Sequence, residues 1–128
     1  MGLSGYTETF DLTISIPNLK NQDGEIQIGI YNTAETFPHV DKQYRVVIID
    51  VSRFSGTYTI KDLPGGEYAV ALMHDENKDK ILNTGFLGIP KEGYGFSINI
   101  RPLLSSPSFK DCKIALNRNM KITINLIY

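Results

Sequence analysis

The chain has 128 residues, which is enough for one domain with a core of its own. Thirteen basic and fourteen acidic residues leave a formal net charge of −1, and no block of like charge stands out. This balance argues against a nucleic-acid-binding protein. No apolar run approaches the roughly 18 residues of a membrane-spanning helix, so we expect no membrane insertion.

The first five residues, MGLSG, are expected to be linker or added residues, so a single domain should span residues 6–128. The start of the sequence shows neither the basic nor the apolar segment of a signal peptide. Cys112 is the only cysteine. It therefore excludes a disulfide within the chain and does not identify the compartment.

Alternation of apolar and polar residues predicts the first strands in chain order. Residues 10–16, FDLTISI, place their apolar side chains on one face. Asp23 and Gly24 then form a dipeptide that is typical of hairpin turns. Residues 25–32, EIQIGIYN, repeat the alternation, and residues 33–42 interrupt it with a loop or a single helical turn.

The later strands differ in how clearly they alternate. Residues 44–51, YRVVIIDV, are apolar on both faces, which is typical of a strand buried on two sides. Residues 56–74 predict a strand, a Pro-Gly-Gly turn and another strand. Residues 109–117 predict a weaker strand, and residues 120–128 predict a last one with clear alternation.

About seven strands and no helical periodicity predict an all-β fold. We expect a seven-stranded antiparallel sandwich of two sheets, prealbumin-like or immunoglobulin-like, with a long loop between the fifth and sixth strands. Its core is expected to contain Ile14, Ile28, Ile48, Val70, Leu72, Ile122 and Ile124.

The long loop begins with a pattern that resembles a calcium-binding loop. Asp75, Asn77 and Asp79 occupy alternate positions, as the first three oxygen ligands of such a loop do. Ile81 would add its backbone carbonyl, and Asn83 would stand at the ninth position. A possible calcium ion is the one cofactor that the sequence indicates.

Two positions depart from this pattern. Lys80 stands where a glycine makes the sharp turn, and Phe86 stands where a bidentate glutamate closes the site. The alternative is a solvated turn in which Asp and Asn side chains bond their own backbone. Both interpretations remain open.

The second part of the loop, GFLGIPKEGYGFS, is rich in glycine and aromatic residues. The glycines, among them Gly93 and Gly95, permit positive φ angles. Phe86, Tyr94 and Phe96 either cover one open end of the sandwich or form a surface for a protein or glycan partner. The first interpretation is favoured, because aromatic side chains usually lie in the interior or at an interface.

No nucleophile stands beside a base in the sequence, so a non-catalytic domain is expected. Ser97 lies in no nucleophile elbow, and Cys112 falls in a predicted strand. His74 is expected to be half-exposed and bonded to a neighbouring loop, and with His39 it shows no metal-ligand spacing. A binding or adaptor module is therefore the first hypothesis, a calcium-dependent module the second and a hydrolase the third.

The stretch DLPGGEYAVALMHDENKDKILNTGFLGIPKEGYGFS, followed by PSFKDCKIAL, resembles the bacterial family called domain of unknown function 2141. The resemblance extends over about residues 10–128. It implies a β-sandwich of the transthyretin or carboxypeptidase-regulatory kind and an extracytoplasmic location (periplasmic, outer-membrane-associated or secreted), with the natural signal peptide missing from this sequence. It implies no activity. Lys78 and Lys80 stand where the family commonly has glycine.

Overall fold

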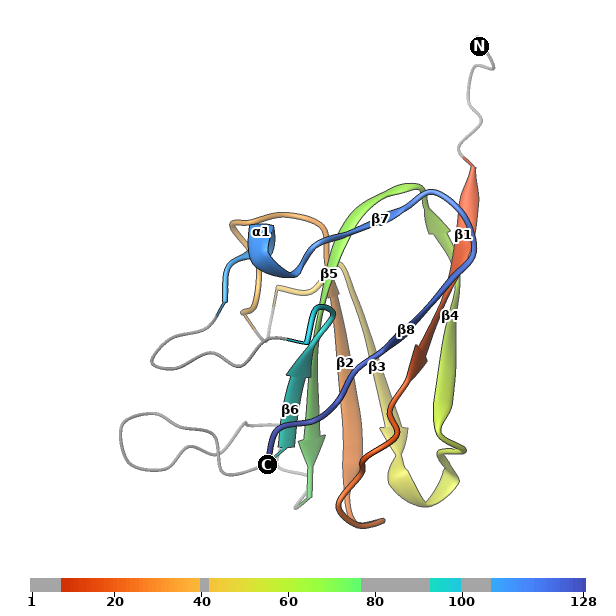
Figure 1. The fold of residues 1–128 in the computed structure, drawn as a ribbon, viewed down its shortest axis with the longest axis vertical. Coiled ribbons are helices and arrows are strands. Elements are labelled where there is room, and N and C mark those ends of the chain that lie inside the picture. Colours follow the sequence, from red (N-terminus) through yellow and green to blue (C-terminus); the bar gives the residue numbers. More distant parts are fainter. Residues whose placement is uncertain (1–7, 40–41, 77–92, 100–106) are drawn as a thin grey trace, which may run out of the picture.

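The computed structural model describes residues 8–39, 42–76, 93–99 and 107–128 (Figure 1). The expected linker, residues 1–5, lies outside these ranges. Two short helical turns occur in the described residues, η1 (Val51–Arg53) and α1 (Phe109–Cys112), and neither is long and apolar enough to cross a membrane. The described strands are β1 (Thr9–Ser15), β2 (Glu25–Tyr31), β3 (Arg45–Asp50), β4 (Thr57–Pro64), β5 (Gly66–Asp75), β6 (Gly93–Phe96), β7 (Ile114–Leu116) and β8 (Met120–Thr123).

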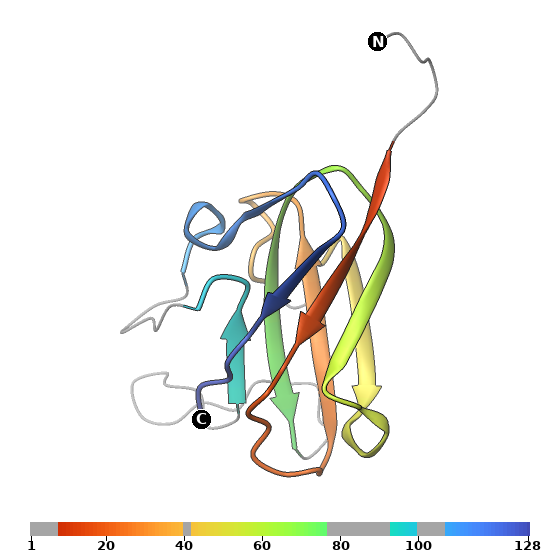
Figure 2. The same cartoon turned by 45° about the vertical axis from the view of Figure 1, so that its right-hand side comes forward.

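The strands form two sheets that face each other, so the expected all-β sandwich is confirmed (Figure 1). One sheet has the order β4-β1-β8, and the other has the order β3-β2-β5-β6, with β7 pairing with the start of β5. All pairings are antiparallel among the described strands except that of β1 with β8, which run parallel and side by side (Figure 2). No hairpin joins β1 to β8, because β8 follows β7, which belongs to the other sheet.

The core lies between the two sheets and follows from the alternation along each strand. On β2, the alternate residues Ile26, Ile28 and Ile30 are fully buried. Five predicted core residues are buried in the same cluster, and a sixth is partly buried and packs against it. The five buried residues are Ile14, Ile28, Val70, Leu72 and Ile124, and the partly buried one is Ile122.

The prediction that Ile48 belongs to the core is wrong. β3 is an edge strand, and its residues alternate between the two faces of the sheet. Val47 and Ile49 pack against the core, whereas Val46 is 49% exposed and Ile48 is 44% exposed on the outer face. The apolar residues on both faces of β3 were misread as a sign of burial on two sides, but the second sheet covers only one of these faces.

The glycine-rich part of the long loop contributes a strand, β6, which pairs with β5. Gly93 and Gly95 point toward the C-terminal segment. A Cβ atom on Gly95 would lie 2.6 Å from Cγ2 of Ile124, and one on Gly93 would lie 2.5 Å from the Tyr128 ring. These glycines therefore permit close packing, and they do not adopt the positive φ that the sequence had indicated.

The strand predicted over residues 109–117 is wrong in its first half, where the chain forms the helical turn α1. The Ser108 hydroxyl accepts a hydrogen bond from the Asp111 backbone N–H (3.2 Å). The Asp111 carboxylate accepts one from the Ser108 N–H (3.4 Å). This capping box satisfies donors that would otherwise have no partner at the helix start, so α1 forms and only Ile114–Leu116 remain a strand.

The outer face of the five-stranded sheet, which points away from the core, carries a second apolar cluster. Phe109 of α1 packs against this cluster, so the turn covers part of the outer face. The buried members of the cluster are Tyr31, Phe37, Ala69, Tyr94, Phe96 and Cys112.

Candidate functional site

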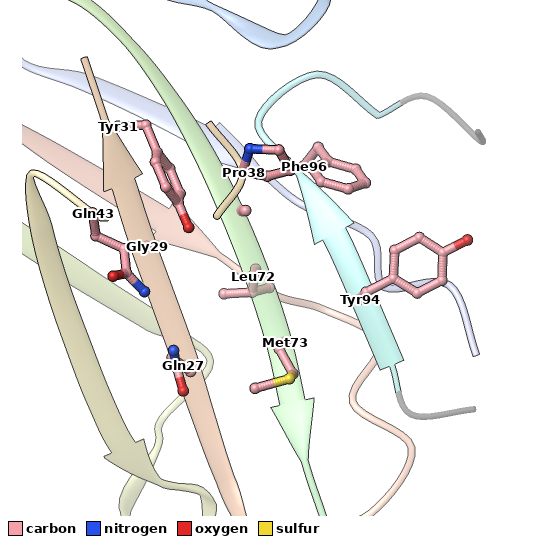
Figure 3. A pocket seen from close by; sticks show the side chains of 10 residues that line it. Gln27, Gly29, Tyr31, Pro38, Gln43, Leu72, Met73, Tyr94 and Phe96 are labelled. Atoms are coloured by element: carbon pink, nitrogen blue, oxygen red, sulfur yellow. The ribbon is translucent and has the colours of Figure 1, made fainter. Parts of the chain in front are cut away.

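A hollow of about 120 Å³ lies beside the second apolar cluster, on the outer face of the five-stranded sheet (Figure 3). Four parts of the chain line it: β2, β5, β6 and the segment between β2 and β3. In that order they contribute Gln27, Gly29 and Tyr31; Ala71, Leu72 and Met73; Tyr94 and Phe96; and Pro38 and Gln43.

The floor of the hollow is made by two small residues that lie opposite each other on neighbouring strands. Gly29 of β2 pairs with Ala71 of β5. A Cβ atom on Gly29 would lie 3.0 Å from Cγ of Gln43 and 3.0 Å from Cε1 of Tyr31. The glycine therefore keeps the hollow open, since a larger side chain would occupy it and push against its walls.

Aromatic rings form the wall on the β6 side, and they contact one another edge to face. Tyr94 and Phe96 have ring centroids 6.0 Å apart at an interplanar angle of 71°. Phe96 also meets Phe37 at 6.1 Å and 70°, and Phe37 meets Tyr31 at 5.2 Å and 85°. Tyr94 is 8% exposed and Phe96 is 9% exposed. The rings thus form a packed wall rather than an open shelf.

Polar groups lie at the opposite side of the hollow. Figure 3 shows the side-chain amides of Gln27 and Gln43 on the β2–β3 side, across from the β6 rings. Both glutamines are partly exposed. An amide can donate and accept hydrogen bonds, so these two groups are suited to peptide or hydroxyl groups of a ligand. The Tyr31 hydroxyl donates to the backbone carbonyl of His39 at 3.1 Å.

The structure tests only part of the surface predicted for a partner. Tyr94 and Phe96 are described, and both belong to the outer-face cluster beside the hollow. They pack against each other on the outer face of the five-stranded sheet. Phe86 lies outside the described residues.

The predicted calcium ligands are also described only in part. Asp75 is 1% exposed at the end of β5, while Asn77, Asp79, Ile81 and Asn83 lie outside the described residues. Glu25 of β2 pairs with both Asp75 and Asp50, so three acidic residues lie side by side on adjacent strands. Within the described residues, no group of three His, Cys, Asp or Glu side chains is arranged to hold a metal ion.

The candidate nucleophiles take part in the packing of the scaffold. The Ser97 hydroxyl accepts a hydrogen bond from the Val70 N–H at 3.0 Å and donates to the Cys112 carbonyl. Burial, followed by the nearby Asp111 carboxylate, raises the pKa of the Cys112 thiol to about 11. At neutral pH this thiol is therefore protonated, and it is also fully buried.

His74 differs from its prediction in exposure but not in its partner. It was expected to be half-exposed, but it is fully buried because β5 directs it inward. Its Nε2 lies 2.7 Å from the backbone carbonyl of Asp23, in the neighbouring β1–β2 loop. Its Nδ1 lies 2.7 Å from the Tyr128 hydroxyl, so both ring nitrogens have partners.

Sequence reasoning did not identify the hollow, although one signal for it was present. Gln27, Gly29 and Tyr31 alternate with the buried isoleucines of β2, yet none of the three carries a charge. A strand face exposed to solvent usually carries charged residues, and their absence indicates that this face is covered or binds something. Pro38 and Gln43 reach the hollow only through the tertiary fold.

Two searches, one of curated proteins and one of solved structures, gave no match to this chain. Residues 14–124 match the family described as "Uncharacterized protein conserved in bacteria (DUF2141)". This match covers most of the chain, from within β1 to just beyond β8. The chain therefore belongs to the bacterial DUF2141 family, as its sequence motifs indicated.

Proposed function

We propose that this domain is a non-catalytic extracytoplasmic module that binds a partner protein through the hollow on the outer face of the five-stranded sheet. An apolar side chain of the partner would enter the hollow, and the amides of Gln27 and Gln43 would bond its backbone. The observation that carries the proposal is the open floor of Gly29 and Ala71 between apolar walls.

The size of the hollow supports a single side chain as the occupant. Its volume is about 120 Å³. Sites for drug-sized ligands and cofactors usually enclose about 300–1,000 Å³. A cavity of about 150 Å³ holds benzene, so this hollow matches one aliphatic or small aromatic group. Single buried anchors of this kind supply much of the binding energy at protein interfaces.

The arrangement of the rings favours a protein over a glycan. A sugar is commonly held by stacking against the exposed flat face of an aromatic ring. Here Tyr94 and Phe96 meet edge to face, and each has less than a tenth of its surface exposed. The apolar residue Met73 and the two glutamine amides complete a lining that suits an apolar side chain and its peptide group.

Two further parts of the proposal have different support. The non-catalytic role is supported by the contacts of Ser97 and Cys112, whose side chains serve the packing of the fold. The extracytoplasmic location is supported by the family resemblance, because related sequences typically follow a signal peptide.

The test fills the hollow without changing the rest of the sheet. Ala71→Phe places a ring over the floor, and Ala115→Phe is the matched control on the exposed side of β7. Peptides selected from a phage-displayed random library on the wild-type protein are the probe. We expect them to share an apolar residue, to shift the amide resonances of Gly29 and Met73, and to lose at least tenfold in affinity with Ala71→Phe only.

Peptides that bind elsewhere, or that bind Ala71→Phe as tightly as wild type, would contradict the proposal. A soluble oligosaccharide panel is titrated in parallel. If Ala71→Phe abolishes the binding of a sugar, and no selected peptide binds at the hollow, the ligand of this site is a glycan and not a protein.

A calcium-dependent role is the second candidate. The observation that favours it is the row of Asp50, Glu25 and Asp75 on adjacent strands. The last of these, Asp75, is also the first residue of the predicted calcium-binding loop. The described residues alone do not form a metal site, so the ion would need ligands from residues 77–83. Without a bidentate glutamate, such a site would bind calcium with a Kd of about 10⁻⁴–10⁻³ M.

Thermal melting tests this second candidate. Calcium at about 5 mM, a concentration above this range of Kd, should raise the Tm relative to a sample with chelator. Asp79→Ala should abolish the rise. An equal Tm in calcium and in chelator, together with no heat in calorimetric titration, identifies the segment as a plain turn.

A further inference from the structure

The strand β3 leaves one row of its backbone groups at an open edge of the five-stranded sheet. The Val51 N–H donates to the Gly24 carbonyl at 3.0 Å, which fixes the alternation of the β2–β3 ladder. By this alternation Val47 and Ile49 bond to β2, and the N–H and C=O groups of Val46 and Ile48 point away from the sheet. No described strand pairs with this side of β3.

Two other strand edges are covered by contacts within the chain. On β6, the Tyr94 N–H donates to the Ile127 carbonyl (3.0 Å), and the Ile127 N–H donates to the Tyr94 carbonyl (2.7 Å). At the end of β8, the Asn99 side chain donates to the Thr123 carbonyl and accepts from the Asn125 N–H, both at 2.9 Å. A further strand therefore meets an obstacle at either place.

The edge of β4 is obstructed as well. Asp62 has φ of 60°, and the β1–β4 register shifts beside it. The guanidinium of Arg45 donates to the backbone carbonyls of Lys61 (3.0 Å) and Asp62 (3.3 Å). A bulge, a lysine and a proline at the end, Pro64, are the features by which natural edge strands avoid pairing with another strand.

β3 has none of these protective features. Its sequence, RVVIID, contains neither lysine nor proline, and it presents Val46 and Ile48 half-exposed on the outer face. Arg45 stands at one end and Asp50 at the other. Arg45 lies on the inner face of the strand, where its guanidinium bonds to β4, and Asp50 lies on the outer face. An antiparallel pair of two such strands places half-exposed aliphatic side chains of one copy opposite those of the other, so the edge is complementary to itself.

We propose that β3 pairs antiparallel with β3 of a second copy of this chain and joins the two five-stranded sheets into one. The two-fold axis is normal to the sheet, because only this operation keeps both outer faces on the same side. Residues whose side chains point to the same face of the sheet then lie opposite each other. Val46 faces Ile48 of the second copy, and both pairs of half-exposed aliphatic side chains become neighbours.

The proposed dimer should be weak and depend on concentration. A single six-residue strand pair buries less surface than the roughly 1,200–2,000 Å² of a stable interface. We therefore expect a Kd of about 10 µM to 1 mM. In this arrangement the two hollows open on the same side. This last consequence rests on the proposed function, but the pairing itself does not.

Sedimentation velocity of the full chain between 5 µM and 1 mM tests the pairing. The wild-type mass should rise from the monomer value of 14.4 kDa toward twice that value. Ile48→Lys should remain monomeric, because two lysines would face the paired edge. Ile98→Lys is the matched control, since Ile98 is 40% exposed and lies beyond β6, on the other side of the sheet.

Hydrogen exchange on the wild-type protein gives a second readout that needs no variant. The amides of Val46 and Ile48 should become protected as concentration rises, while those of Val47 and Ile49 are protected throughout. A wild-type protein that is monomeric at 1 mM overturns the proposal. The open edge of β3 would then be available only to a strand of a different protein. Equal dimerisation of wild type and Ile48→Lys, or concentration-independent exchange at Val46 and Ile48, overturns it too.

Discussion

Replacing Tyr128 by Phe removes the central link of a hydrogen-bond chain that holds the C-terminal segment against the β1–β2 loop. The carbonyl of Asp23 can only accept, so Nε2 of the buried His74 carries the proton and donates to it (2.7 Å). In the neutral imidazole, Nδ1 of His74 then accepts from the Tyr128 hydroxyl (2.7 Å). That hydroxyl in turn accepts from the Lys20 N–H (2.9 Å).

The expected loss follows from what the substitution leaves behind. Tyr128→Phe keeps the ring in its place against Gly93 and deletes one oxygen atom. The fully buried Nδ1 of His74 then has no donor, whereas the Lys20 N–H is at an exposed site where water can replace the hydroxyl. An unpaired buried acceptor costs about 1–3 kcal/mol. For a domain of this size, each kcal/mol lowers the Tm by about 3–4 °C.

Urea denaturation followed by circular dichroism measures this loss, with Tyr58→Phe as the control for an exposed tyrosine. A double-mutant cycle with His74→Phe should give a coupling of about 1 kcal/mol or more, because the two side chains share one hydrogen bond. A Tyr128→Phe protein within about 0.3 kcal/mol of the control would refute a stabilising hydrogen bond between Tyr128 and the buried His74.

Three further predictions concern the core, β6 and the buried thiol. Leu72→Ala should lower the free energy of unfolding by about 2–5 kcal/mol in urea denaturation, because the side chain is fully enclosed in the core. Gly95→Ala should lower it by about 1–3 kcal/mol, because the added Cβ would lie 2.6 Å from Ile124; an unchanged Tm would contradict this packing. Burial, followed by Asp111, raises the pKa of Cys112 from 9.0 to about 11, so the folded state retains a proton that the unfolded chain releases. The resulting stability, about 2–3 kcal/mol, is present below pH 9 and lost as the pH rises through 11. Cys112→Ala should lack this part of the alkaline decline, and the wild-type thiol should not react with Ellman's reagent at pH 8 until the protein unfolds.

The sequence by itself determined the fold class and most strand positions. The alternation of Ile26, Ile28 and Ile30 is a local property, because side chains of a strand point to opposite faces in turn whatever the partner strand is. The dipeptide Asp23-Gly24 marks a change of chain direction, and Gly24 has φ of 76°, a conformation that glycine adopts readily. It does not form the predicted hairpin turn, because β1 and β2 lie in different sheets. The motif after β5 was specific enough to indicate the family.

Other features depend on which segments meet in space. The sequence predicts Ile48 in the core because a strand with apolar residues on both faces has the same pattern in the centre of a sheet and at its edge. Only the strand order β3-β2-β5-β6 shows that β3 is at the edge. The role of Gly95 likewise depends on Ile124, which lies 29 residues away in the chain and meets it through the parallel pairing of β8 with β1. Such contacts leave no periodic signal in the sequence.

The candidate site shows the same division. Tyr94 and Phe96 were singled out from composition, but the hollow also needs Gly29 and Ala71, which the β2–β5 register places opposite each other. His74 was expected at a strand end and half-exposed. It is buried because the Tyr128 ring and the β1–β2 loop close over it, and this enclosure exists only once both ends of the chain have joined the sandwich.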